Sequence, residues 1–140
     1  MKTILLIAHL FAVATGTGMS IANYVNIRIA STEKGDRQAS LVYLRRVLAR
    51  FADVIIAMLW ITGLALWWIL PPGIEPTSWI YVLLLFAVTM TVCHGLARMT
   101  AGKMARTGDM SLSPRMELLV SGVWTSQLLA IIFAVLAFEK

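Results

Sequence analysis

Four long apolar segments, separated by shorter polar ones, dominate the chain. They cover about residues 3–27, 51–70, 79–97 and 118–138. Each is close to the roughly 20 residues that a helix needs to cross a hydrocarbon core of about 30 Å. The second ends at Pro71-Pro72-Gly73, which cannot continue a helix, and Ser113-Pro114 before the fourth is typical of a helix start. The pattern predicts an all-α, integral membrane four-helix bundle, a single transmembrane domain over residues 1–140.

An amphipathic segment, about residues 37–50, precedes the second apolar segment. Apolar residues recur there at spacings of three and four, with arginines on the opposite side: Leu41, Leu44, Leu48 and Phe51. This spacing places the apolar side chains on one face of a helix. We expect this helix either to lie on the cytoplasmic membrane surface or to extend the second spanning helix into the cytoplasm.

Composition excludes several other classes of protein. Hydrophobic residues make up 59% of the 140 residues and charged residues make up 14%. Soluble domains have about 45–50% and about 25% respectively, and disordered chains are poorer still in apolar residues. The single cysteine, Cys93, cannot form an intrachain disulfide, so a disulfide-stabilised secreted scaffold is also excluded.

Basic residues gather in two of the segments that join the apolar stretches. The first holds Arg28, Lys34, Arg37, Arg45, Arg46 and Arg50, and the second holds Arg98, Lys103, Arg106 and Arg115. The segment between the second and third apolar stretches has no Lys or Arg. The positive-inside rule therefore predicts cytoplasmic basic segments and both termini outside. Because these segments explain the net charge of +5, we expect a lipid bilayer and no nucleic acid as partner.

The first apolar segment has a second interpretation. Lys2, the apolar run to Val13 and the small residues Ala12-Val13-Ala14 together resemble a signal peptide with its cleavage site. The apolar stretch continues well past residue 14, however, and it contains His9, which favours a retained first helix.

Small and polar residues share one face of the first predicted helix. Small residues recur every fourth position in two rows, Ala8, Ala12, Gly16 and Ser20, and Ala14, Gly18 and Ala22. Such rows let another helix approach closely. His9 and Asn23 lie on the face of the first row, and ionisable groups inside a span are usually functional. His9 is therefore a candidate site residue, while Gly16, Ser20 and Asn23 are candidate polar packing residues.

The third predicted helix carries the second histidine, His94, one turn before Arg98 on the same face. Asp53 begins the second spanning helix on the same side of the membrane. A carboxylate inside a membrane needs a cation, so we expect Asp53 to pair with Arg98 or Arg50. His94 lies deeper than Arg98, which makes it the better candidate for function.

Two histidines inside a helical bundle suggest haem b, whose iron is commonly held by imidazole. His9 and His94 lie on helices that run in the same direction, but His94 is further from the start of its helix. At 1.5 Å per residue their depths differ by roughly 13 Å. We therefore expect each histidine to act as a ligand separately, without clamping one iron between them.

Two other functions fit the same residues. Cys93 and His94 offer soft ligands for copper together with the methionines that flank or follow them, although neighbouring helical residues point about 100° apart. These methionines are Met90, Met99, Met104, Met110 and Met116. Alternatively the chain is a non-enzymatic accessory subunit or assembly factor that packs through the Gly16/Ser20 ridge, in a homo-oligomer or a larger membrane complex. No phosphate-binding loop, catalytic triad or zinc motif is present, so no catalytic residue is assigned.

Several sequence positions resemble a known group of membrane proteins. The resemblance is carried by Ile7-Ala8-His9-Leu10, by Trp60-Ile61-Thr62-Gly63-Leu64-Ala65-Leu66 after an acidic residue, and by a third helix from Trp79 to His94. In these features the chain is similar to the HemJ-type protoporphyrinogen oxidases, the copper-resistance CopD domains and related four-helix membrane proteins. The resemblance implies a haem-associated bundle in a bacterial inner membrane, with His9 as the histidine carried over.

The chain departs from the HemJ-type enzymes at one position. Those enzymes have a lysine in the third helix, shortly after its tryptophan, where Val82, Leu83 and Leu84 stand here. We therefore predict haem-b binding in redox or haem metabolism, with His9 and His94 as candidate iron ligands, and assign no protoporphyrinogen oxidation.

Overall fold

The computed structural model describes residues 2–69 and 78–138, and four long helices account for most of them. The helices are α1 (Lys2–Ala30), α2 (Gly35–Trp68), α3 (Trp79–Thr107) and α4 (Ser113–Phe138), with a short 3-10 turn, η1 (Met110–Leu112), before α4. Each long helix has the length and composition to cross a membrane. The predicted all-α fold with four long apolar helices is confirmed. The predicted break at Pro71-Pro72-Gly73 lies outside the described residues.

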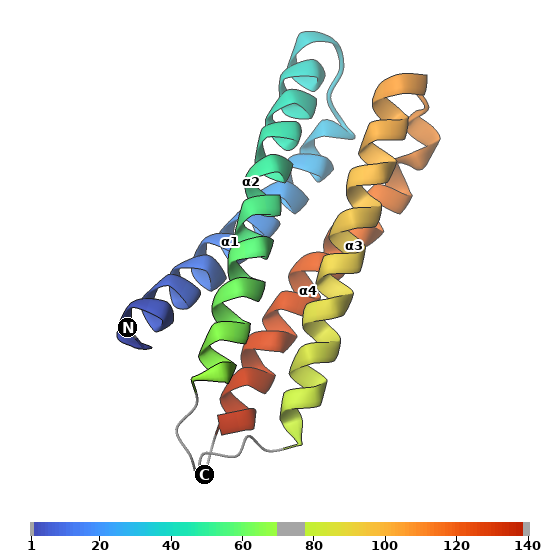
Figure 1. Cartoon of the computed structure of the whole chain (residues 1–140). Coiled ribbons are helices and arrows are strands. Elements are labelled where there is room, and N and C mark those ends of the chain that lie inside the picture. Colours follow the sequence, from blue (N-terminus) through green and yellow to red (C-terminus); the bar gives the residue numbers. More distant parts are fainter. Residues whose placement is uncertain (1, 70–77, 139–140) are drawn as a thin grey trace.

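The helices form two antiparallel hairpins (Figure 1). α1 packs along α2, α3 packs along α4, and the hairpins meet where α1 contacts α4. Backbone packing between α2 and α3 is sparse over the described residues. The start of α1 and the end of α4 lie at the same end of the bundle, as expected for four helices that alternate in direction.

Glycines in the left-handed region stand at the turns on the opposite end. Gly35 begins α2 with a φ of +64°, and Gly108 follows α3 with a φ of +67° and donates its N–H to Met104 O at 2.9 Å. Glycine adopts this conformation without the steric cost that other residues meet. Because α2 is continuous from Gly35, the amphipathic segment 37–50 extends the second helix, which was one of the two predicted arrangements.

The buried core is small and most large apolar side chains point outward. Its main cluster comprises Ile27, Ala97, Met104, Met116 and Val120, near the end that carries the basic residues. Large hydrophobic side chains around the outside are exposed, among them Trp68 at 90%, Tyr81 at 72% and Leu118 at 71%. An apolar exterior of this extent suits a lipid bilayer, as the composition predicts.

Candidate functional site

His9 on α1 is hydrogen-bonded to Thr62 on α2. His9 Nδ1 lies 2.8 Å from Thr62 Oγ1, and that hydroxyl lies 2.6 Å from Met58 O, the carbonyl one turn earlier. A carbonyl oxygen only accepts, and the 2.6 Å distance favours donation of the hydroxyl proton to Met58 O. In that arrangement His9 Nδ1–H is the donor to Thr62. Nε2 is then left with a lone pair, which is the form of imidazole that binds metals.

The His9 imidazole lines an apolar cavity of about 450 Å³ between the two hairpins, the His9 cavity. All four helices contribute to its walls, which include Leu6, Leu10, Trp60, Leu64, Trp67, Ile80, Leu83 and Leu84. Gly63 leaves room for the imidazole, because a Cβ there would come 3.3 Å from His9 Cε1. A cavity of this size and lining accommodates an organic ligand.

A polar layer formed by Gly16, Ser20 and Gln127 crosses the middle of the bundle; we call it the glutamine layer. Gln127 on α4 is 5% exposed, accepts a hydrogen bond from Ser20 Oγ at 3.1 Å and donates one to Val13 O at 3.4 Å. Gly16 permits this contact, since a Cβ there would lie 2.7 Å from Gln127 Nε2. The Gly16/Ser20 row therefore serves packing within the chain, whereas Gly18 of the second row is exposed.

Asp53 on α2 binds two side chains of α3. Its Oδ1 lies 2.7 Å from His94 Nε2, and its Oδ2 lies 3.2 Å from Arg98 Nη2. The predicted pairing of Asp53 with Arg98 is confirmed. His94, expected as a separate candidate ligand, instead has its Nε2 engaged by this carboxylate.

A second polar link connects the same two helices. Trp60 Nε1 on α2 donates to Thr91 Oγ1 on α3 at 3.0 Å. Together with the contacts of Asp53, this bond joins α2 to α3 through side chains where their backbones pack little. The space left between these helices holds a second cavity.

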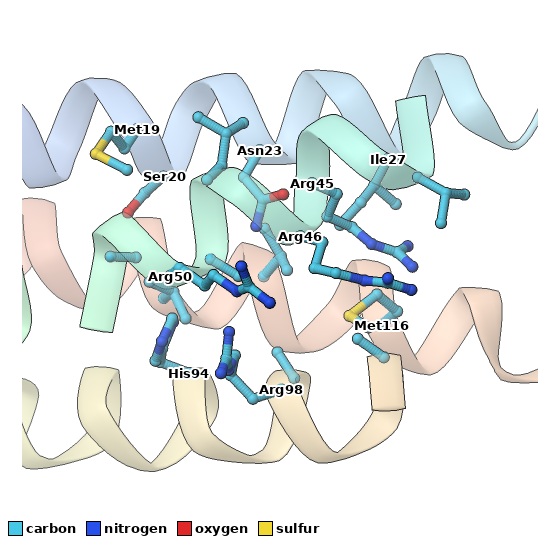
Figure 2. A pocket seen from close by; sticks show the side chains of 18 of the residues that line it. Met19, Ser20, Asn23, Ile27, Arg45, Arg46, Arg50, His94, Arg98 and Met116 are labelled. Atoms are coloured by element: carbon cyan, nitrogen blue, oxygen red, sulfur yellow. The ribbon is translucent and has the colours of Figure 1, made fainter. Parts of the chain in front are cut away.

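This second cavity, the arginine cavity, has a volume of about 520 Å³ and lies on the other side of the glutamine layer from the His9 cavity. Five arginines line it, Arg45, Arg46 and Arg50 from α2 and Arg98 and Arg106 from α3. In Figure 2 the side chains of Arg45, Arg46, Arg50 and Arg98 project into the space between α2 and α3. Asn23 projects into it from α1, and its Oδ1 is buried without a hydrogen-bond partner among the described residues.

The two histidines lie far apart in the bundle. Their partners on α2, Thr62 and Asp53, are nine residues apart, which is about 13 Å along a helix. This separation agrees with the depth difference expected from the sequence. A single ion bound by both imidazoles is therefore excluded by distance.

Cys93 and His94 face different helices, although they are neighbours in sequence. Cys93 Sγ lies against α4, 3.0 Å from where a Cβ on Gly122 would stand, whereas His94 binds Asp53 on α2. Across residues 2–69 and 78–138, no group of three or more His, Cys, Asp or Glu side chains is arranged to hold a metal ion. The geometry therefore gives no support to copper binding by this pair.

Sequence reasoning missed Thr62 and Gln127. Gln127 carries a visible signal, because it is an amide inside the fourth apolar segment. Thr62 carries none, because threonine occurs throughout these helices and commonly bonds its own backbone, as Thr89, Thr91 and Thr125 also do.

Comparison with known proteins found no matching family model, curated protein or solved structure. The resemblance to HemJ-type and CopD-like proteins stays a prediction from the sequence.

Proposed function

We propose that this protein binds haem b through His9, as a small multi-pass protein of a bacterial inner membrane with both termini outside the cytoplasm. The observation that carries the proposal is the hydrogen bond between His9 Nδ1 and Thr62 Oγ1 at the wall of an apolar cavity. With Thr62 as the acceptor of this bond, Nε2 of the neutral ring keeps a lone pair. Histidines that bind metals almost always donate their other ring N–H in this way.

The residues around His9 fit the chemistry of haem b. The porphyrin ring is flat and apolar, and the His9 cavity offers the aromatic side chains of Trp60 and Trp67 beside aliphatic walls. The two propionates of haem are anionic, and Lys2, which also lines the cavity, supplies a cation for one of them. A cavity of about 450 Å³ that opens between hairpins can take a ligand partly exposed to lipid.

Bound haem supplies one-electron oxidation and reduction, which is the chemistry of redox and haem metabolism. The chain's own residues orient and shield the site. Thr62 fixes the rotation and tautomer of the His9 ring, Gly63 leaves space beside it, and the apolar walls exclude water. Exclusion of water and a hydrogen bond to the ligating histidine both tune the reduction potential of an iron centre.

His94 is not part of this proposed site. Its Nε2 is engaged by Asp53, which lies nine residues, about 13 Å, before Thr62 along α2. The accessory-subunit alternative also loses its main observation, because the Gly16/Ser20 ridge is occupied by Gln127 of the same chain.

Absorption spectroscopy tests the proposal. The full chain is purified in mild detergent from haem-replete cells, and spectra are recorded in the oxidised and reduced states. We expect a Soret band in the wild type, its loss in His9→Ala and its retention in His94→Ala, which is the matched intramembrane control. Because His9→Ala removes only one hydrogen bond, its elution volume on size exclusion should match the wild type. A colourless wild-type protein, or an unchanged spectrum in His9→Ala, would overturn the proposal.

The proposed orientation has a separate test. Both basic segments lie at the end of the bundle opposite the start of α1 and the end of α4. We expect a periplasmic reporter fused after Lys140 to be active and a cytoplasmic reporter at the same position to be inactive. The opposite pattern would reverse the orientation without affecting the haem site.

A further inference from the structure

The arginine cavity holds more positive charge than the chain itself balances. Of its five arginines, Arg98 is paired with Asp53 and Arg106 bonds a carbonyl of its own helix. Arg45, Arg46 and Arg50 have no ion pair with a carboxylate among the described residues. Like charges at close range repel, and Arg45 is also partly buried, so an anion from outside the chain would stabilise this arrangement.

Beyond the arginines most of the lining of the same cavity is aliphatic, with Ser20, Asn23, His94 and Gln127 as polar members. Ile55, Leu59, Met90, Val120 and Val123 line its deeper part, up to the glutamine layer. Its walls therefore combine guanidinium groups at the basic end of the bundle with aliphatic side chains toward the middle. A free inorganic anion would use the first part alone, whereas an amphiphile would use both.

The cavity lies where a membrane lipid can reach it. Backbone contact between α2 and α3 is sparse over the described residues, and the links between them are the side chains of Trp60, Thr91, Asp53, His94 and Arg98. A lipid acyl chain that enters from the bilayer between α2 and α3 is therefore not blocked by continuous packing of one helix on the other. Arg45, Arg46 and Arg50 lie in the first half of α2, and Arg98 and Arg106 lie in the last part of α3, outside or at the boundary of the apolar segments. If the helices cross a membrane, this is the level of the lipid head groups.

We propose that the arginine cavity is a binding site for one anionic phospholipid, with its phosphate held by Arg45, Arg46 and Arg50 and an acyl chain against the apolar wall of α2 and α3. Guanidinium groups bind phosphate through paired N–H donors and so provide both charge and geometry. Arg98 on the opposite wall is already paired with Asp53, so the three arginines of α2 are the ones left to bind the phosphate. This site is separate from the His9 cavity and does not depend on haem binding.

Asn23 narrows the choice of head group. Its buried Oδ1 accepts no hydrogen bond from the described residues, and its side chain points into the cavity beside the arginines. Rotation of the Asn23 side chain, which lines the cavity, would present this oxygen to a head-group alcohol such as the glycerol of phosphatidylglycerol, which supplies the missing donor. Phosphatidic acid has the phosphate but no head-group alcohol, so the wild type should prefer phosphatidylglycerol.

Native mass spectrometry of the full chain in detergent tests the site. The probes are phosphatidylglycerol, phosphatidic acid and phosphatidylcholine with the same acyl chains, and excess inorganic phosphate as a competitor. The test variant is Arg45→Gln/Arg46→Gln/Arg50→Gln. The matched control, Arg37→Gln/Lys103→Gln/Arg115→Gln, removes the same charge from residues that do not line the cavity.

We expect the wild type to retain one phosphatidylglycerol and to bind phosphatidylcholine weakly. A basic residue near an anionic lipid contributes about a fivefold gain in affinity, so the triple variant should bind phosphatidylglycerol roughly 100-fold more weakly. The control variant should lose less than about fivefold. Should the triple variant not fold, Arg46→Gln, which changes one exposed side chain, should still weaken binding about fivefold.

Three outcomes would overturn the proposal. Equal retention of phosphatidylglycerol and phosphatidylcholine would show that the arginines do not select an anionic lipid and only contact lipid head groups in general. An equal loss in the control variant would show an effect of net charge. Displacement of the lipid by inorganic phosphate, or binding of phosphate alone, would make the occupant a free anion. Asn23→Leu should remove the preference over phosphatidic acid, and an unchanged preference would remove Asn23 from the site.

Discussion

The two histidines show how a partner determines what an imidazole can do. His9 donates to a threonine hydroxyl at 2.8 Å and lines an apolar cavity, so its Nε2 keeps a lone pair. His94 has its Nε2 2.7 Å from the carboxylate of Asp53, which also holds Arg98. The first environment suits metal ligation, and the second suits joining two helices. The same residue type thus lines a cavity at one end of the bundle and joins two helices at the other.

The largest effect should come from removing the carboxylate at the architectural end. Asp53→Asn leaves Arg98 without its counter-charge and weakens the bond to His94. Asp53 is 44% exposed but serves two partners, so we expect the free energy of unfolding to fall by about 2 kcal/mol, measured by denaturation in detergent, with the His9 spectrum unchanged. Asp36→Asn, an exposed carboxylate on the same helix, is the control. Equal losses in the two variants would mean that Asp53 does not join the helices.

A substitution at Gly16 tests the glutamine layer, which separates the His9 cavity from the arginine cavity. In Gly16→Ala the new Cβ would lie 2.7 Å from Gln127 Nε2 and 3.1 Å from Ile55 Cγ2, so Gln127 must move and its bonds to Ser20 and Val13 weaken. We expect a loss of about 1–3 kcal/mol in unfolding free energy.

Gly18→Ala is the matched control for Gly16→Ala, because a Cβ at Gly18 meets nothing within 4 Å. Alanine favours a helix over glycine by about 1 kcal/mol, so this variant should be as stable as the wild type or more so. If both variants lost stability equally, the glutamine layer would not be the cause.

The contrast between the histidines can be sharpened at Thr62. Thr62→Val keeps the shape but removes the acceptor for His9 Nδ1–H, so the proposed haem should bind about 10–100-fold more weakly, measured by haem titration. Thr89→Val controls for the loss of a threonine bond to its own helix, since Thr89 donates to Leu85 O and is exposed. An unchanged haem affinity in Thr62→Val would assign this hydroxyl a packing role alone.

The smallest effect should come from the ion pair between Arg28 and Glu117. These side chains lie 2.6 Å apart but are 61% and 33% exposed, so the pair should contribute less than about 1 kcal/mol outside lipid. A double-mutant cycle of Arg28→Gln and Glu117→Gln measures the coupling, which should shrink as salt is raised. A coupling above that of Asp53 with Arg98 would reverse our ranking of the two ion pairs.

The fold was largely predictable because each helix carries its own signal. Length and apolar composition located all four helices, and the arginines opposite Leu41, Leu44 and Leu48 indicated the extension of α2. The pairing of Asp53 with Arg98 was also predictable, because an acidic and a basic side chain at the same depth in a membrane stabilise each other's charge. The full lengths of α2 and α3 were underestimated, because the polar ends of these helices extend past their apolar parts.

The candidate sites were less predictable because they depend on how the helices are paired. No single helix sequence indicates that α3 packs on α4 and leaves a space beside α2. The arginines of α2 were interpreted only as determinants of orientation, and their common cavity appeared once α2 and α3 were placed side by side. The partners of His9 and Ser20, namely Thr62 and Gln127, likewise depend on helix rotation.

The division into two hairpins has a consequence for how the chain is made. During synthesis the first hairpin, α1 with α2, leaves the ribosome before α3 does, and membrane helices can insert before they associate. The contact of α1 with α4 and the hydrogen bond from Ser20 to Gln127 form only when the last helix arrives. The last step in the assembly of this molecule is therefore the packing of α4 on α1, which forms the glutamine layer between the two cavities.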